Sequence, residues 1–202
     1  MIRRLLVLAL ASASIALPLA SRAADVTELA GVKYDNTVTL ANTKLQLNGA
    51  GIRYKFVKVY TAALYLTNKA ATPEAVLAAS GPRRMHIVML REINAEELGR
   101  LFTKGMEQNA SREEFSKVIP GVIKMGEMFA ARKKLVAGDY FSIDYVPGVG
   151  STILVNGKVE TGPIKEPEFF ASLMKIWLGK NPADAQLKEA LLGHTKGNDP
   201  FN

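Results

Sequence analysis

The chain has 202 residues, of which 48% are hydrophobic, and contains no cysteine. The lack of cysteine excludes disulfides, thiol redox chemistry, cysteine nucleophiles and zinc–thiolate sites. The formal net charge is +7, and the lysines and arginines are scattered along the chain. A solvated surface explains such a pattern, and we expect no nucleic-acid partner.

The N-terminus predicts a signal peptide. Residues 1–4 are basic at their end, residues 5–20 are apolar, and residues 21–23 place small side chains at positions −3 and −1 of a cleavage site. Cleavage after Ala23 would lower the formal charge from +7 to +4, because the removed segment holds three arginines and no acid. The apolar run is shorter than the ~20 residues that span a bilayer, so a retained anchor is the weaker alternative. We expect a periplasmic protein, residues 24–202, with one domain and no integral membrane span.

The first part of the mature chain predicts β-strands. Val32–Leu47 alternates polar and apolar residues, and Val59–Leu66 is a clearer strand. The stretch between them mixes charged and apolar residues on both faces. Arg53 and Tyr60 there fall on opposite parities, so they share a pocket only if the chain turns or bulges between them. We expect two strands meeting at a turn near Lys55–Val57, with a β-bulge as the alternative.

Helix signals dominate the middle of the chain. A Thr N-cap followed by Pro opens a short helix at residues 72–74, and residues 84–90 form a strand entering the core. Residues 94–97 and 111–114 each carry a capping-box signature and open further helices. Pro120 should kink the second of these helices or end its first segment.

The last third predicts strands and then helices. Two strands follow residue 139, and Asn156-Gly157 is a strong signal for a two-residue hairpin. Helices are expected from Pro167 to Gly179 and from Asn181-Pro182 to Leu192. Strands, helices, a hairpin and two final helices together predict an α+β fold with a largely antiparallel sheet.

Few residues carry recognisable chemistry. His86 and His194 lie far apart without a local carboxylate pattern, and no nucleotide-binding or hydrolase motif occurs. We therefore predict no metal, no cofactor and no defined catalytic residue. Arg53 has two interpretations: its head reaches solvent from an apolar strand, or it binds a carboxylate with a tyrosine hydroxyl as second donor.

Two stretches resemble motifs of the chalcone isomerase superfamily. "GAGIRYKFVKVYTAALYL", 49–66, resembles the motif in which Gly-x-Arg precedes Lys, a Thr or Tyr, and Tyr-Leu. "FFASLMKIWLGKNPADAQLKEALLG", 169–193, resembles the closing helices, with Trp, Pro and Asp at the family's spacing. The resemblance extends over about residues 31–193. It implies an open-faced β-sandwich, with a long antiparallel sheet and helices layered on one face.

The resemblance also implies a site. In the plant isomerases an arginine holds an oxyanion, a threonine and a tyrosine organise the reaction, and a lysine and an asparagine complete the site. The arginine matches Arg53, and the threonine falls on Tyr60, as in the fatty-acid-binding branch. The helical tyrosine, lysine and asparagine fall on Glu97, Arg100 and Lys104, with a one-residue shift as the alternative register. The tyrosine is lost and lysine replaces the neutral asparagine, so chalcone cyclisation is not expected. The resemblance instead suggests a carboxylate-binding set of Arg53, Tyr60, Arg100 and Lys104.

Three functions follow as hypotheses. The first is a periplasmic, non-catalytic protein that binds a fatty acid or similar apolar carboxylate in a cleft between sheet and helices. The second is an isomerase or intramolecular lyase on a substrate other than chalcone, with Arg53 holding an oxyanion and Tyr60 or Tyr54 donating a proton. The third is an interaction module with a vestigial pocket. The sequence leaves the oligomeric state open.

Overall fold

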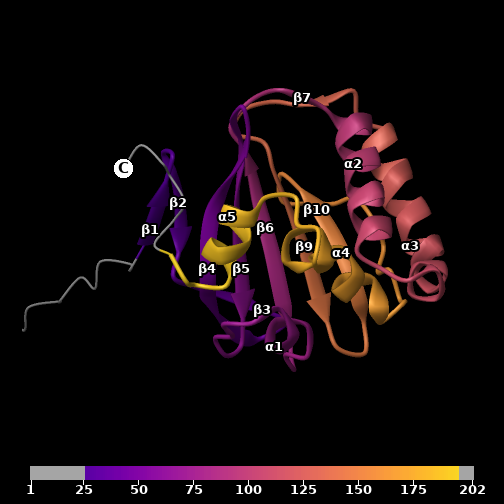
Figure 1. Cartoon of the computed structure of the whole chain (residues 1–202), viewed down its shortest axis with the longest axis horizontal. Helices are drawn as coiled ribbons and strands as arrows, with labels where there is room; N and C mark the ends of the chain where they lie inside the picture. Colours follow the sequence, from indigo (N-terminus) through magenta and orange to yellow (C-terminus); the bar gives the residue numbers. More distant parts are fainter. Residues whose placement is uncertain (1–25, 196–202) are drawn as a thin grey trace, which may run out of the picture.

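A curled seven-stranded antiparallel sheet organises the chain, with the long helices on one side of it (Figure 1). The computed structural model describes residues 26–195, and the expected signal peptide lies outside these described residues. The strand order is β11-β10-β9-β6-β5-β4-β3. The strands are β3 (Thr37–Leu40), β4 (Thr43–Lys55), β5 (Val57–Leu66), β6 (Arg83–Met89), β9 (Tyr140–Val146), β10 (Gly150–Val155) and β11 (Lys158–Val159).

The remaining elements of residues 26–195 are two small two-stranded sheets, β1-β2 and β7-β8, and five helices. The small strands are β1 (Val26–Leu29), β2 (Val32–Asp35), β7 (Ile93–Asn94) and β8 (Lys134–Leu135). The helices are α1 (Pro73–Leu77), α2 (Ala95–Gln108), α3 (Arg112–Ala130), α4 (Glu168–Leu178) and α5 (Ala185–Leu191). The predicted α+β fold, an open-faced β-sandwich with helices layered on one face of a long antiparallel sheet, is confirmed.

The sheet has a large core on its helical face and a small core on its outer face. Trp177 of α4 and Phe141 of β9 are both fully buried in the large core. On the outer face the β1–β2 hairpin contributes Tyr34 to a second cluster with Leu45 and Tyr65. Apolar burial of this kind is the main driving force for folding, so the helical face holds most of the stability.

Two β-bulges shift the alternation of the central strands. Leu47 pairs with Tyr65 but Gly49 pairs with Leu64, so Asn48 is an extra residue in β4. Before this bulge the odd-numbered residues Leu45 and Leu47 of β4 belong to the outer cluster. After it the even-numbered Ala50 does. A one-residue insertion exchanges the two faces of a strand. The later odd positions of β4 consequently face the helices.

Several local signals agree with the structure. The capping box at Ser111 is formed in full, and Asn94 caps α2 by accepting from Glu97 N. Asn156 and Gly157 both have positive φ, as the predicted two-residue hairpin between β10 and β11 requires. Pro120 does not end α3, which continues past it as one helix.

The last helix starts later than the sequence suggested. We expected Asn181-Pro182 to open it, but α5 begins at Ala185 with Asp184 as its N-cap. The Asp184 carboxylate accepts from two backbone N–H groups of the first turn, whereas the side-chain amide of Asn181 donates to the Gln108 carbonyl oxygen at the end of α2. None of the helices among residues 26–195 is long and apolar enough to cross a membrane.

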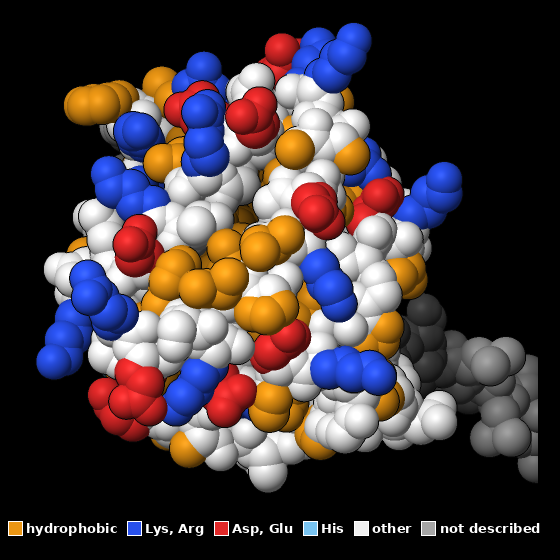
Figure 2. All heavy atoms as spheres, turned by 90° about the vertical axis from the view of Figure 1, so that its right-hand side faces the viewer, with side chains coloured by type: hydrophobic (Ala, Val, Ile, Leu, Met, Phe, Trp, Pro, Cys, Tyr) orange, Lys and Arg blue, Asp and Glu red, His pale blue; other side chains and the backbone are white. Residues whose placement is uncertain are grey.

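The helices α2 and α3 form one outer face of the molecule. Figure 2 shows apolar side chains gathered in the middle of this face, with charged side chains of both signs around them. The most exposed large apolar residues of these helices are Leu101, Ile119 and Ile123. Of these, only Leu101 also lines the cavity described below.

The outer face of the sheet holds a polar cluster around His86. Its Nδ1 lies 2.7 Å from Ser142 Oγ, and its ring contacts the rings of Tyr34 and Tyr140. Burial, with help from the positive charge of Arg84, lowers the pKa of His86 to about 4. The imidazole is therefore neutral in the folded protein at neutral pH.

We expect acid to destabilise the protein through His86. An unfolded histidine titrates near pH 6.5, so between pH 6.5 and 4 the unfolded chain binds more protons and stability falls as pH falls. Allowing for the partial exposure of the ring, the loss from pH 7 to pH 5 should be about 1–2 kcal/mol. Urea denaturation of wild type and His86→Gln at both pH values measures it. His194→Gln should keep the loss and His86→Gln should remove it. Equal losses in both variants would contradict the assignment.

Candidate functional site

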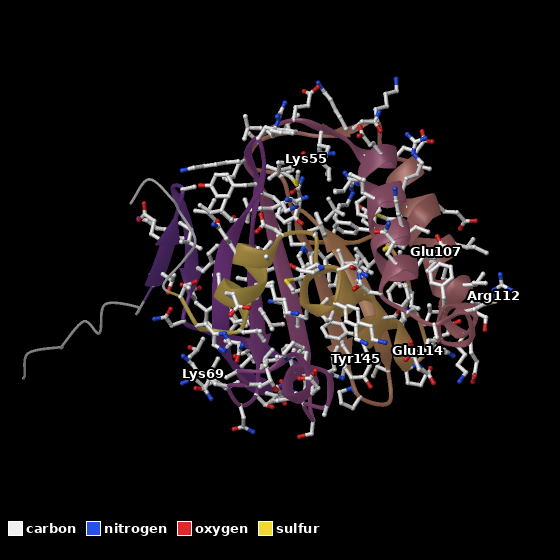
Figure 3. All side chains as sticks on the ribbon, viewed as in Figure 1. Lys55, Lys69, Glu107, Arg112, Glu114 and Tyr145 are labelled. Carbon is white, nitrogen blue, oxygen red and sulfur yellow. The ribbon has the colours of Figure 1, made fainter. Side chains whose placement is uncertain are left out.

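A cavity of about 560 Å³ opens at one end of the sheet, between the tip of the β4–β5 hairpin, α2 and the α4–α5 connection. Figure 3 shows Lys55 at this end and Lys69 at the opposite end of the molecule. The volume lies within the ~300–1,000 Å³ of typical ligand sites. Its apolar lining comprises Val59, Ile93, Leu98, Leu101, Phe102, Ile176, Pro182 and Ala183. Its ionisable lining comprises Arg53, Lys55, Tyr60, Arg91, Glu92, Glu97 and Lys104.

Arg53 and Tyr60 are directly opposite each other in the β4–β5 ladder. Residues opposite each other in an antiparallel pair project from the same face. A second register shift follows, because Tyr54 pairs with Lys58 and Val59 becomes the extra residue. The turn and the bulge that we considered as alternatives therefore both occur. Both side chains reach the cavity on the helical side of the sheet.

The Arg53 guanidinium has a carboxylate partner. Its Nη1 lies 3.4 Å from Asp184 Oδ2 and also donates to the Tyr54 carbonyl oxygen. Asp184 Oδ2 accepts from Tyr54 N at 3.0 Å, while Oδ1 accepts from Gln186 N and Leu187 N at the start of α5. One carboxylate thus joins the end of β4 to α5 and orients Arg53. The Arg53 side chain remains 21% exposed, so it is accessible from the cavity.

The Tyr60 hydroxyl is buried and receives hydrogen bonds from two sides. Trp177 Nε1 donates to it at 2.9 Å, and Arg53 contributes a second hydrogen bond. Burial raises the pKa of Tyr60 to about 12, even though both hydrogen bonds act in the opposite direction. The phenol is therefore neutral at physiological pH. Because its oxygen already accepts from Trp177 and Arg53, its own O–H is left to donate.

Helix α2 contributes only some of the residues predicted from the sequence. Glu97 and Lys104 line the cavity, as does Leu101 between them. Arg100 does not: it is exposed and lines a separate shallow groove with Thr103. Successive helical residues point about 100° apart, so Leu101 and Arg100 face different directions. The structure thus places Arg100 apart from Arg53, Tyr60 and Lys104, and the binding role predicted for it stays a prediction.

The rim of the cavity is more basic than acidic. Lys55, Arg91 and Lys104 line it, against Glu92 and Glu97. Glu92 already has a partner, because Lys134 Nζ lies 2.7 Å from its carboxylate. A cleft lined by an excess of one charge attracts ligands of the opposite sign, here an anion. Among residues 26–195 no group of acidic or histidine side chains is arranged to hold a metal ion.

Comparison with known proteins settles the family. The sequence profile of chalcone isomerase-like proteins matches residues 26–193. This chain belongs to the chalcone isomerase-like family. A solved structure of the same fold, a fatty-acid binding protein from Arabidopsis thaliana, superposes with a TM-score of 0.66 at 14% identity. The alignment covers 82% of this chain and 94% of the plant protein. No curated protein sequence gives a significant match.

Two residues of this chalcone isomerase-like site belong to the sequence motifs, but the sequence predicted no role for them. Trp177 and Asp184 are the Trp and Asp of the closing-helix motif, and the structure brings them to Tyr60 and Arg53. The sequence signal for Asp184 was its position directly before a helical segment, which is typical of an N-cap. No local pattern indicated the contact of Trp177, because its partner lies 117 positions away.

Proposed function

We propose that this chalcone isomerase-like protein binds a fatty acid or similar apolar carboxylate in the cavity and does not catalyse a reaction. The observation that carries the proposal is the pairing of Arg53 with Tyr60 in the lining of a cavity that also has apolar side chains in its lining. A guanidinium and a phenol O–H are both donors suited to a carboxylate. The fold of the plant fatty-acid binding protein is consistent with this use of the site.

The apolar lining supplies most of the affinity. Each buried methylene contributes about 0.8 kcal/mol, whereas a charge-assisted hydrogen bond contributes about 1.5–3 kcal/mol net. The hydrocarbon tail of a bound acid, lying along Leu98, Phe102 and Ile176, therefore contributes more binding free energy than its carboxylate. Asp184 already neutralises part of the Arg53 charge. The basic residues at the rim therefore supply the remaining positive charge that attracts a negative ligand. Arg53 confers orientation and selectivity for an acid.

The state of Tyr60 argues against acid catalysis. A general acid works best when its pKa lies near the operating pH, and burial holds the pKa of Tyr60 at about 12. The helical tyrosine and asparagine of the plant isomerases are also absent from α2. A panel of hydroxychalcones and related unsaturated phenols tests this directly. Turnover above buffer that disappears in Arg53→Ala would favour the isomerase instead.

Arg53→Ala should weaken fatty-acid binding by about 10- to 100-fold, the equivalent of the ~1.5–3 kcal/mol of a charge-assisted contact. Calorimetric titration with a series of saturated fatty acids measures the change, and the matched alcohols measure the contribution of the carboxylate. Arg100→Ala removes the same charge from outside the cavity and should leave affinity unchanged. If Arg53→Ala and Arg100→Ala behave alike, the head-group assignment is wrong.

We further propose that the protein works in the periplasm, after removal of residues 1–23. The support is the sequence of the N-terminus, with its basic start, apolar run and small residues before Ala24. Cell fractionation followed by N-terminal sequencing of the recovered protein tests this. Native mass spectrometry of the same material would show whether it carries an acid. A chain recovered in the cytoplasm that still begins at Met1 would overturn the location without affecting the binding proposal.

A further inference from the structure

Phe56 occupies the tip of the β4–β5 hairpin in an unfavourable setting. Lys55 and Val57 pair across the turn, and Phe56 between them is fully exposed, with a relative accessibility of 103%. Its φ is +63°, in the left-handed region that bulky residues rarely adopt. Glycine or asparagine suits such a position better. The positive φ of the turn disfavours phenylalanine, and so does full exposure of its ring to water. We take the presence of phenylalanine here as a sign that the ring contacts a partner outside the chain.

The surroundings of Phe56 combine apolar and basic character. Val57 is also exposed beside it, and Lys55 precedes it in the turn. Lys55 and Arg91 are in addition rim residues of the cavity. Figure 1 shows this hairpin end next to β7, at the same end of the molecule as the start of α2. The aromatic tip therefore lies beside a residue that lines the cavity, Lys55.

This combination fits a lipid surface better than a protein. A stable protein interface buries about 800 Å² on each partner, which one turn with a single aromatic residue does not supply. A membrane interface accepts a few aromatic side chains at the depth of the head groups. Basic residues beside them gain from the negative potential of anionic lipids. The charge of Lys55 and Arg91 is complementary to such a surface.

We propose that the β4–β5 hairpin docks on anionic phospholipid bilayers, with Phe56 inserted among the head groups and Lys55 and Arg91 against their phosphates. Docking is weak and reversible, because one aromatic residue and a few cations provide it. It does not depend on the cavity being occupied. Where the proposed function also holds, docking brings the cavity mouth to the lipid from which an apolar acid would enter.

Vesicle co-sedimentation tests the proposal. Wild-type protein should pellet with vesicles containing phosphatidylglycerol, less so at high salt, and much less with pure phosphatidylcholine. Phe56→Ser should reduce the bound fraction at least about fivefold, and Lys55→Glu should also reduce it. Val159→Ser replaces another exposed apolar residue, 63% accessible on β11, and should bind like wild type. All variants are compared as chains that begin at Ala24, so the apolar run of residues 5–20 does not itself bind the vesicles.

A second readout follows the tip directly. Trp177, the single tryptophan of the chain, is buried in the core, so Phe56→Trp adds a reporter at the surface. Its emission should shift to the blue with anionic vesicles.

Equal pelleting of wild type and Phe56→Ser, or no pelleting with anionic vesicles, would overturn the proposal and leave a protein or a second copy as the partner. Phe56 does not line the cavity, so Phe56→Ser should keep wild-type affinity for fatty acids in solution. Vesicle pelleting therefore tests membrane docking, and fatty-acid affinity tests the proposed function separately.

Discussion

A Gly49→Ala variant should lose about 3 kcal/mol or more of folding free energy, at the upper end of single substitutions. A Cβ on residue 49 would lie 2.0 Å from the Ala190 carbonyl oxygen and 2.8 Å from that of Leu191. Both atoms belong to the backbone of α5, so no side-chain rotation relieves the clash. The helix must move away from β4, which exposes apolar surface such as the buried Leu187.

Gly126→Ala is the matched control, since a Cβ there meets nothing within 4 Å. It lies inside α3, where alanine is favoured over glycine by about 1 kcal/mol, so this variant should gain stability. Urea denaturation of both variants measures the contrast. Because α5 carries Asp184, Gly49→Ala should also weaken ligand binding. Equal stabilities for the two variants would show that α5 does not rest on the β4 backbone as described.

The fold was predictable where local chemistry decides the conformation. The hairpin at Asn156-Gly157 needs two positive φ angles, and those two residue types accept them most easily. The capping box at Ser111 involves residues three apart in the chain. The motif resemblance then supplied the arrangement of the sheet and helices, which the family match confirms.

The bulge at Asn48 was not predictable from its neighbours. Its side chain donates to the carbonyl oxygens of Leu191 at 2.7 Å and Ala70 at 2.9 Å, and accepts from Ala70 N. These contacts join the bulge to segments 22 and 143 positions away. Alternation read along the sequence alone therefore assigns the wrong faces after residue 48. Without that shift, Arg53 would project from the opposite face of the sheet.

The site was predicted in part because the motifs give positions but not directions. Arg53, Tyr60 and Lys104 line one cavity, while Arg100 points elsewhere although it fits the family spacing. The rotation of α2 about its axis decides this, and its core contacts set that rotation through residues such as Phe102. Binding by the three cavity residues stays a prediction.

Asp184→Asn should raise the affinity for a fatty acid about fivefold, equivalent to the ~1 kcal/mol of a partly exposed ion pair. Asp184 and a bound carboxylate compete for the same guanidinium, because Asp184 Oδ2 lies 3.4 Å from Arg53 Nη1. Asparagine caps helices as well as aspartate does, so its oxygen can still accept from Gln186 N and Leu187 N. The substitution therefore removes the competing charge and keeps the cap of α5, but it gives up the bond from Tyr54 N, because the amide nitrogen that replaces Oδ2 cannot accept.

Asp184→Ala separates the structural role of the residue from its charge. Alanine loses the helix cap, worth about 1 kcal/mol, together with the bonds to Tyr54 N and Arg53. We expect a total loss of about 2–3 kcal/mol of stability. The variant should bind acids less well than Asp184→Asn because the start of α5 is no longer capped. Urea denaturation and calorimetric titration of the same preparations measure both effects.

Glu189→Gln provides the control for charge alone. Glu189 lies on α5 as well, but its partner is His194, at 2.6 Å. Removing its charge should leave fatty-acid affinity unchanged, since neither residue lines the cavity. If Asp184→Asn instead weakens binding, the orientation that Asp184 gives to Arg53 matters more than the charge it neutralises, and the competition argument is wrong. If it strengthens binding while Glu189→Gln does not, Arg53 is the group that meets the carboxylate, and the Arg53–Asp184 pair sets how tightly an acid is held.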